Sequence, residues 1–266
     1  MTDKWTRDQL LVAFNLYCRI PFSKTKANNP SVIQIAQLVG RSPAAVAMKL
    51  GNFGSFDPAL RNRGIKGLSQ TAKRDREIWD EFNQNWGKLT VDSVLAKERL
   101  LSTAQTKNGR TDRTGWSGKS SPEKLEQLLT GPTEVVRETR VRLHQRFFRE
   151  AVLASYGISC CVCSNPVPEL LTAGHIIPWA EREDLRANPR NGLCLCSLHH
   201  SAFDCGLWTL DESFKIILSS HLTKYLPSQT LEANFLQFSR SDIRMPDKFW
   251  PQEKFLAHHR LNLFRA

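Results

Sequence analysis

The stretch CCVCSNPVPELLTAGHIIPWAEREDLRANPRNGLCLCSLHHSAFD, residues 160–204, decides how the second half of this chain is read. It begins with a C-x-x-C pair, Cys160 and Cys163, and it closes on a C-x-x-H pair, Cys196 and His199. Zinc takes four thiolate or imidazole ligands in a tetrahedron, and each x-x spacing lets one tight turn supply two of them. The pattern therefore predicts a structural Zn²⁺ site.

The cysteine count supports reduced thiols. The chain has 7 cysteines, an odd number, and its first residues, MTDKWTRDQL, lack the apolar core of a signal peptide. A disulfide framework fits poorly with these features, so we expect a cytoplasmic protein with a metal site. Cys161 and Cys194 stay open as alternative ligands, and so does a cluster of buried cysteines with no metal.

A second set of residues is superimposed on the zinc pattern: His175 in AGHIIPW, Asn191 in NPRNGL and His200 in HHSAFD. A neutral imidazole with a pKa of roughly 6.5 suits a general base. His175 ends a predicted strand, and the side-chain carbonyl of Asn191 is the expected acceptor for its second ring nitrogen. His200 opens a predicted short helix, and Asp204 lies one turn later on the same face. These two side chains are expected to hold a divalent metal.

This combination resembles the HNH, or ββα-metal, nuclease family in its restriction-enzyme branch. The matching features are AGHIIPW, NGLCLC and LHHSAFD, preceded by a Q-x-x-F-R element made of Gln145, Phe148 and Arg149. The resemblance covers about residues 135–222. It implies that His175 activates water for attack on a phosphodiester, leaving 5′-phosphate and 3′-hydroxyl ends. Mg²⁺ and Mn²⁺ are the expected catalytic metals, because both suit nitrogen and oxygen ligands.

The chain departs from the family at one position. Many members place an acidic residue or a histidine directly before the general base, as a metal ligand, whereas this chain has Gly174. The missing ligand is then expected from Asp204, water or the substrate phosphate. His199 is assigned to zinc because it completes the knuckle, and His200 to catalysis because it lies nine positions after Asn191, as in the family. The reverse assignment of the two histidines stays open.

The charge is concentrated in the first half of the chain. The net charge is +11, and residues 1–122 hold 20 Lys and Arg against 10 Asp and Glu, whereas residues 123–266 hold 17 against 16. Such a distribution is typical of a polyanion binder, and nucleic acid is the commonest polyanion. A basic protein without such a partner is the alternative. No stretch is long and apolar enough for a membrane helix.

Residues 30–52 predict two helices joined by a tight turn. Gly40 would end the first helix, and Ser42 would cap the second. The spacing of Ala36, Gly40 and Val46 resembles the helix-turn-helix of DNA-binding proteins, although a plain helical hairpin can show it too. A basic loop follows at 53–70, either solvated or in contact with phosphates. The residues expected to contact DNA are Arg41, Ser42, Lys49, Arg61, Arg63 and Lys66.

The predicted fold class is α+β, with a mostly helical DNA-binding domain followed by a zinc-stapled ββα-metal nuclease domain. The predicted divisions are 1–101 for a helix-turn-helix or winged-helix-like domain, 102–122 for a Ser-, Thr- and Gly-rich linker, and 123–266 for the nuclease domain with a C-terminal extension. Further elements expected are helices over 5–19, 71–86 and 133–156 and a hairpin over 206–226. The pair His258 and His259 is expected at the surface or facing DNA.

These features together predict a DNA endonuclease with one divalent metal and a histidine base, in the role of a restriction enzyme. A separate reader domain beside an HNH nuclease is also the layout of modification-dependent enzymes, so methylated and hydroxymethylated bases are candidate targets. A homodimer would let two nicks make a double-strand break. The alternatives are a homing or phage-type HNH nuclease and a non-catalytic, zinc-containing DNA-binding regulator. A regulator would have no need of His175, Asn191 and His200.

Overall fold

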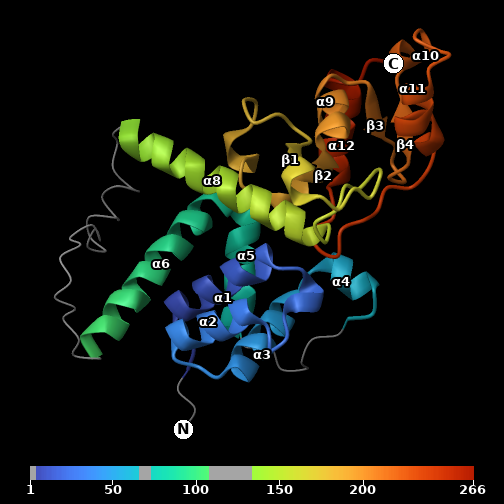
Figure 1. Cartoon of the computed structure of the whole chain (residues 1–266). Coiled ribbons are helices and arrows are strands. Elements are labelled where there is room, and N and C mark those ends of the chain that lie inside the picture. Colours follow the sequence, from blue (N-terminus) through green and yellow to red (C-terminus); the bar gives the residue numbers. More distant parts are fainter. Residues whose placement is uncertain (1–3, 66–72, 108–133) are drawn as a thin grey trace. The chain divides into compact units, whose positions relative to one another are not determined.

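The computed structural model describes residues 4–65, 73–107 and 134–266, which form an α+β protein (Figure 1). The chain divides into two compact units, Met1–Phe147 and Phe148–Ala266, and the division falls inside one helix. The first six residues of the predicted linker end a long helix, and its other residues lie outside the described ranges. Among the described residues, no helix has the length and apolar character that a membrane span requires.

The first unit is helical. Its elements are α1 (Arg7–Arg19), the short 3-10 helix η1 (Phe22–Lys24), α2 (Pro30–Val39), α3 (Pro43–Gly54), α4 (Pro58–Asn62), α5 (Lys73–Gln84), α6 (Trp86–Lys107) and the start of α8 (Glu134–Ser155). The helices expected over 5–19 and 71–86 are confirmed as α1 and α5. A capping box begins α1, because Thr6 accepts from the Gln9 amide while the Gln9 side chain accepts from the Thr6 amide.

The predicted pair of helices over 30–52 is confirmed as α2 and α3. Asn29 caps α2, and Ser42 caps α3 by accepting from the Ala45 amide. Between them Gly40 takes the left-handed conformation, with φ at 65°, which only glycine adopts without steric cost. The tight turn brings the buried Ala36 of α2 and Val46 of α3 into one core.

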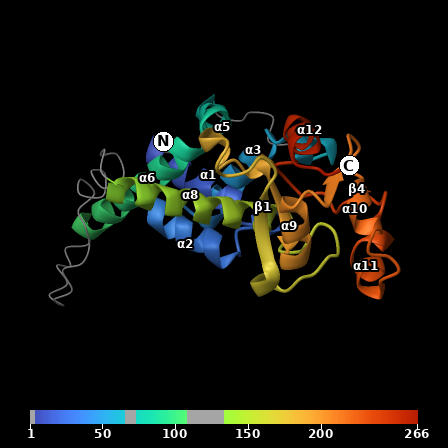
Figure 2. The same ribbon diagram turned by 90° about the horizontal axis from the view of Figure 1, so that it is seen from above.

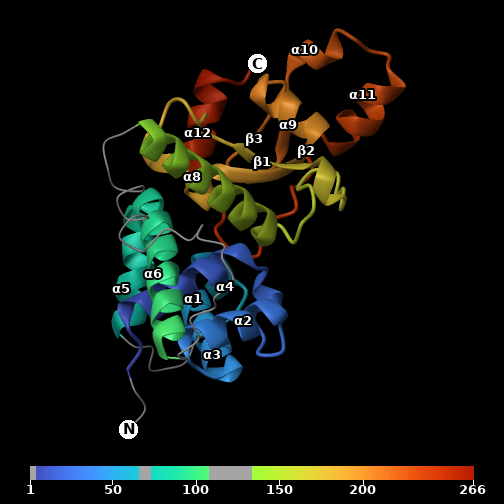
Figure 3. The ribbon, with the colours of Figure 1, turned by 60° about the vertical axis from the view of Figure 1, so that its left-hand side comes forward.

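The core of the first unit is built on α1, which contacts α2, α3, α5 and α6 (Figure 3). Phe14 lies at its centre, with its ring 4.9 Å from that of Phe53 and 4.4 Å from that of Phe82. Trp79 and Trp86 extend this aromatic cluster along α5 and α6. Aromatic rings bury large apolar areas, so this cluster provides much of the apolar burial that holds these helices together.

The second unit contains two small antiparallel sheets surrounded by short helices. After the end of α8, its elements are η2 (Pro168–Leu170), β1 (Leu171–His175), η3 (Glu183–Leu185), η4 (Pro189–Asn191), β2 (Gly192–Cys196), α9 (Ser197–Asp204), β3 (Trp208–Leu210), β4 (Ile216–Leu218), α10 (Ser220–Thr223), α11 (Gln229–Asn234), η5 (Leu236–Phe238) and α12 (Glu253–Asn262). The hairpin expected over 206–226 is confirmed, because β3 pairs with β4. The helix expected over 133–156 is confirmed as α8.

The strands β1 and β2 pair so that Leu171 faces Cys196 and His175 faces Gly192. Helix α9 follows β2 directly and packs against both strands (Figure 2). This arrangement is the expected ββα unit. It brings His200 of α9 against Gly174, the residue before His175 on β1.

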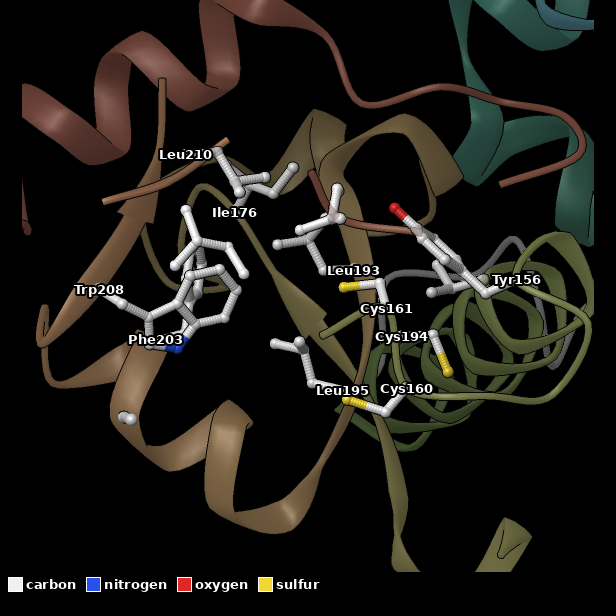
Figure 4. Close-up of a cluster of buried hydrophobic side chains, with 14 of the residues drawn as sticks. Tyr156, Cys160, Cys161, Ile176, Leu193, Cys194, Leu195, Phe203, Trp208 and Leu210 are labelled. Carbon is white, nitrogen blue, oxygen red and sulfur yellow. The ribbon is translucent and has the colours of Figure 1, made fainter. Parts of the chain in front are cut away.

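The core beneath this unit is formed mainly by β2 and the residues around it. Leu193, Cys194 and Leu195 are each 0% exposed; Leu193 and Leu195 face Phe203 and Trp208, and Cys194 lies on the opposite side of the strand, towards Tyr156 (Figure 4). All five residues of β2 are buried, which explains why the strand reads as a continuous apolar run rather than an alternating one. The buried strand fixes the backbone from which the functional side chains extend.

Candidate metal and catalytic site

The four predicted zinc ligands lie together. The ligand atoms of Cys160, Cys163, Cys196 and His199 all lie within 4.8 Å of one another. The Sγ atom of Cys196 is 3.0 Å from Nδ1 of His199 and 3.8 Å from Sγ of Cys163. Three thiols and one imidazole in such a cluster are a donor set that suits tetrahedral Zn²⁺. These residues could therefore hold a metal such as zinc.

The surroundings of the cluster select its ligand atoms. Nε2 of His199 lies 2.8 Å from the backbone oxygen of Asn234, and a carbonyl only accepts, so this nitrogen carries the proton. The unprotonated Nδ1 then faces the sulfurs, as a metal-binding histidine requires. Burial raises the pKa of the Cys163 thiol to about 12, so thiolate at that position needs a bound cation at neutral pH.

The structure also decides between the alternative cysteines. Cys161 and Cys194 belong to the hydrophobic core rather than to the four-residue cluster. The Cys161 amide donates to the Cys194 carbonyl at 2.8 Å, which joins the turn between Cys160 and Cys163 to β2. Burial raises the pKa of both thiols, that of Cys194 to about 12. Both side chains are therefore neutral core residues.

His175 is held in one orientation at the end of β1. Its Nε2 lies 3.1 Å from the backbone oxygen of Arg186, so this nitrogen donates a hydrogen bond. The proton acceptor of the ring is therefore Nδ1. One face of the imidazole stacks on Phe148, with ring centroids 3.7 Å apart, and the edge of the ring meets Trp179. Burial lowers the pKa of His175 to about 4, so the ring is neutral at physiological pH.

Asn191 does not make the hydrogen bond expected of it. Its side-chain oxygen accepts from the Ile177 amide at 2.9 Å, and its side-chain nitrogen donates to the Ile177 carbonyl. Its own backbone oxygen accepts from the Ile176 amide. Asn191 therefore clamps the backbone that leaves β1 just after His175. The acceptor for the histidine ring is the Arg186 carbonyl instead, because the chain folds back there through a loop that sequence spacing does not reveal.

Gly174, the residue directly before His175, lies beneath His200. A Cβ atom at residue 174 would lie 2.7 Å from Cδ2 and 3.2 Å from Nε2 of the His200 ring. Any side chain there would displace the histidine. The absence of a ligand at this position thus has a structural reason, because the space is filled by the imidazole that α9 supplies.

His200 and Asp204 lie one helical turn apart, as predicted. Nε2 of His200 is 3.3 Å from Oδ2 of Asp204, and their side chains are 26% and 54% exposed. Partial burial raises the pKa of Asp204, and His200 opposes this shift. An imidazole nitrogen and a carboxylate oxygen that face each other and reach solvent suit a small divalent cation. The pair could hold such a metal, and His200 lies near enough to His175 to lower the pKa of that ring.

Sequence reasoning missed part of the support around His175. The Arg186 side chain donates to the Trp179 carbonyl at 3.0 Å, and its guanidinium lies over the Trp179 ring at 4.9 Å. Arg149, which entered the resemblance as part of a motif, donates to the Leu171 carbonyl at 2.8 Å. It therefore anchors the start of β1 to α8. The contact between Phe148 and His175, which are 27 residues apart in the sequence, could not have been inferred from residue spacing either.

The C-terminal histidines are not equivalent. Nε2 of His258 lies 2.8 Å from the carboxylate of Glu181, and both side chains are partly exposed. His259 is 0% exposed, stacks on Phe203 and contacts the Thr209 hydroxyl through Nδ1. The expectation that both histidines lie at the surface is therefore wrong for His259, because the inward face of α12 packs against β3.

The residues predicted to contact DNA differ in placement. Arg61 and Arg63 are exposed at the end of α4, and the guanidinium of Arg41 donates to the Lys4 backbone oxygen. Ser42 is exposed and caps α3 with its hydroxyl. Lys66 lies outside the described residues.

Lys49 lies in the interior rather than at the surface where DNA contact was expected. Its ammonium is 2.8 Å from both carboxylate oxygens of Asp75, which is itself 0% exposed. Asn52 donates to the same carboxylate. An amphipathic pattern alone does not show that a carboxylate on another helix draws this lysine inward.

Comparison with known proteins supports the site. Residues 160–211 match the sequence profile of a family described as HNH endonuclease. The match begins at the first zinc knuckle and runs through β1, β2, α9 and β3, so it covers the ββα unit and every residue assigned above to metal or catalysis. No curated protein sequence matches this chain. The second unit thus contains an HNH-type segment, and DNA is the substrate that this match implies.

Proposed function

We propose that this chain is an endonuclease that hydrolyses phosphodiester bonds of double-stranded DNA with a histidine general base and one divalent metal. The observation that carries the proposal is the environment of His175. A neutral ring donates through Nε2 to the Arg186 carbonyl and keeps Nδ1 for a proton, beside a His200–Asp204 pair suited to a metal. The HNH profile match over 160–211 supports the same reaction class.

The residues would divide the reaction among them. Nδ1 of His175 accepts a proton from water as that water attacks phosphorus. Asn191 keeps the backbone after β1 in place, so that the ring cannot swing away from the attacking water. Mg²⁺ or Mn²⁺ held by His200 and Asp204 would supply charge stabilisation at the scissile phosphate. Zn²⁺ at Cys160 and its three partners would fix β2 and α9 relative to the knuckle.

The first unit would provide DNA affinity. Between Gln9 and Arg76 the sequence has only two carboxylates, Asp57 and Asp75, and both side chains are 0% exposed. Asp57 caps α4, and Asp75 is paired with Lys49. The exposed basic residues of the same stretch that the structure describes are Arg19, Lys24, Lys26, Arg61, Arg63, Lys73, Arg74 and Arg76. Arg76 is paired with Asp80 on its own helix, and the other exposed cations of this stretch suit the phosphate backbone.

The biological role we propose is restriction of foreign DNA. A first unit that binds DNA, joined to a second unit with an HNH segment, fits an enzyme that cuts only where the first unit binds. The bound site would include methylated or hydroxymethylated bases. Pairing of two copies would convert two nicks into a double-strand break. A homing or phage-type nuclease would share the site but differ in the sequence that it cuts.

The test is a plasmid cleavage assay with Mg²⁺ and with Mn²⁺. The substrates are one plasmid prepared unmodified, adenine-methylated, cytosine-methylated and hydroxymethylated. His175→Ala is expected to lose cleavage, whereas His221→Ala, at an exposed histidine on α10, is expected to keep it. DNA binding without cleavage of any substrate would identify a regulator instead. Cleavage that survives His175→Ala would place the active site elsewhere.

A further inference from the structure

Helix α3 exposes an unusual face. Both polar side chains within Pro43–Gly54, Lys49 and Asn52, point inward and bind Asp75. The outward face consists of Ala44 and Met48, which are exposed, with the half-buried residues Ala45, Ala47 and Gly51 beside them. Met48 is 57% exposed. The second helix of the helix-turn-helix pair therefore presents to solvent no side chain able to donate or accept a hydrogen bond.

Basic residues flank α3 in the sequence. Arg41 precedes α3, Arg61 and Arg63 lie on and just after α4, and no exposed carboxylate occurs in the described parts of 9–76. An apolar helix face with basic residues on the preceding turn and the following helix suits a ligand that is apolar where it meets the face and negative at its border. The major groove of duplex DNA has this pattern, because phosphates border it and C5-methyl groups project from its floor.

We propose that α3 contacts the C5-methyl groups of pyrimidines in the major groove of duplex DNA. This inference rests on the proposed DNA-binding role of the first unit and specifies its chemistry. Alanine and methionine side chains cannot pair with the donors and acceptors of base edges, so the methyl group is the one base feature that they can recognise by apolar contact. Thymine and 5-methylcytosine carry this group at the same ring position. Cytosine and uracil lack it.

The same chemistry disfavours a hydroxymethyl group. A hydroxyl pressed against Ala44 and Met48 would lose its hydration without gaining a partner. Of the two modifications proposed as targets, methylation therefore fits this surface better than hydroxymethylation. The phosphates would be bound by Arg61 and Arg63, whose contacts carry no information about the base.

The test measures binding by fluorescence anisotropy, with the full chain carrying His175→Ala so that DNA stays intact. Five duplexes of one base sequence are compared: unmodified, with uracil in place of thymine, with uracil and 5-methylcytosine, with uracil and 5-hydroxymethylcytosine, and with thymine and 5-methylcytosine. Affinity is expected to fall about fourfold per contacted methyl when uracil replaces thymine. Adding 5-methylcytosine to the uracil duplex restores affinity if its methyl is the one contacted, and 5-hydroxymethylcytosine restores less.

Variants separate this surface from the rest of the unit. Met48→Gln keeps the side-chain length and helix propensity, and it is expected to reduce the preference for methylated duplexes. Arg61→Ala is expected to weaken binding to all duplexes equally and to lower its salt dependence. Ile33→Gln changes another exposed apolar residue, on α2, and is the matched control.

The outcomes are distinct. Equal affinity of the wild-type surface for all five duplexes, with DNA binding intact, would overturn the methyl contact and leave the proposed function standing. Failure to bind any duplex would overturn the DNA-binding role of the first unit itself. Loss of self-association in Met48→Gln, measured by sedimentation with DNA affinity unchanged, would show that the face binds a second copy of the chain and would also overturn the inference.

Discussion

Replacing Gly174 by alanine should reduce cleavage without unfolding the protein. The added Cβ would lie 2.7 Å from Cδ2 of His200, about 0.7 Å short of the 3.4 Å at which ordinary van der Waals contact begins. The strand backbone is held by its pairing with Leu193, so the ring of His200 must move instead. A displacement of about 1 Å in a catalytic group costs about 100-fold in rate, and we expect a loss of that size.

The assay is single-turnover cleavage of a supercoiled plasmid at saturating enzyme, so that the rate reports chemistry rather than binding. Zinc content and thermal unfolding of Gly174→Ala should match the wild type, because residue 174 does not contact the four-residue metal cluster. Leu198→Ala, at an exposed side chain on the same helix as His200, is the control and should cut normally.

Gly174→Asp sharpens the test. If the glycine merely lacked a ligand, an added carboxylate would maintain or raise activity. If the His200 ring fills the space above residue 174, the larger aspartate side chain should lower the cleavage rate further than alanine does. A Gly174→Ala rate equal to that of the wild type, with fold and zinc intact, would refute the packing argument.

Four further predictions concern stability and protonation. Cys163→Ser should abolish stoichiometric zinc binding, measured by elemental analysis, and lower the melting temperature. Lys49→Met should cost about 3–5 kcal/mol in urea unfolding, since it removes the ammonium that neutralises the buried Asp75 carboxylate, and Lys49→Met with Asp75→Leu should recover much of this loss. Burial lowers the pKa of His259 to about 4, so the unfolded chain binds a proton first as pH falls. The contribution of His259 to the free energy of unfolding should therefore drop by about 2 kcal/mol from pH 7 to pH 5, and His259→Leu should remove that part of the pH dependence. Phe148→Ala should expose the stacked face of the His175 imidazole and raise its pKa from about 4 towards 6.5. If His175 is the proposed base, the acid limb of the cleavage profile should then move to higher pH, whereas Phe148→Tyr should leave the limb in place.

Local sequence determined the elements and the ligand pairs. The capping residues Thr6, Asn29 and Ser42 begin helices where the sequence predicts them, and Gly40 ends α2 in the left-handed conformation. Such signals are readable because they depend on backbone groups only a few residues away. The C-x-x-C and C-x-x-H pairs are readable for the same reason, since each pair is set by a single turn.

Tertiary structure decided what each side chain meets. Lys49 reads as an exposed cation on its own helix, yet Asp75 from α5 draws it into the interior. Asn191 reads as the partner of His175, but the Arg186 carbonyl takes that place, and Gly174 reads as a missing ligand until α9 brings His200 over it. These contacts join segments far apart in the chain, where spacing gives no guide to distance. The sequence by itself therefore determined which chemical groups this protein has, whereas packing decided which partner each group contacts and which groups remain exposed.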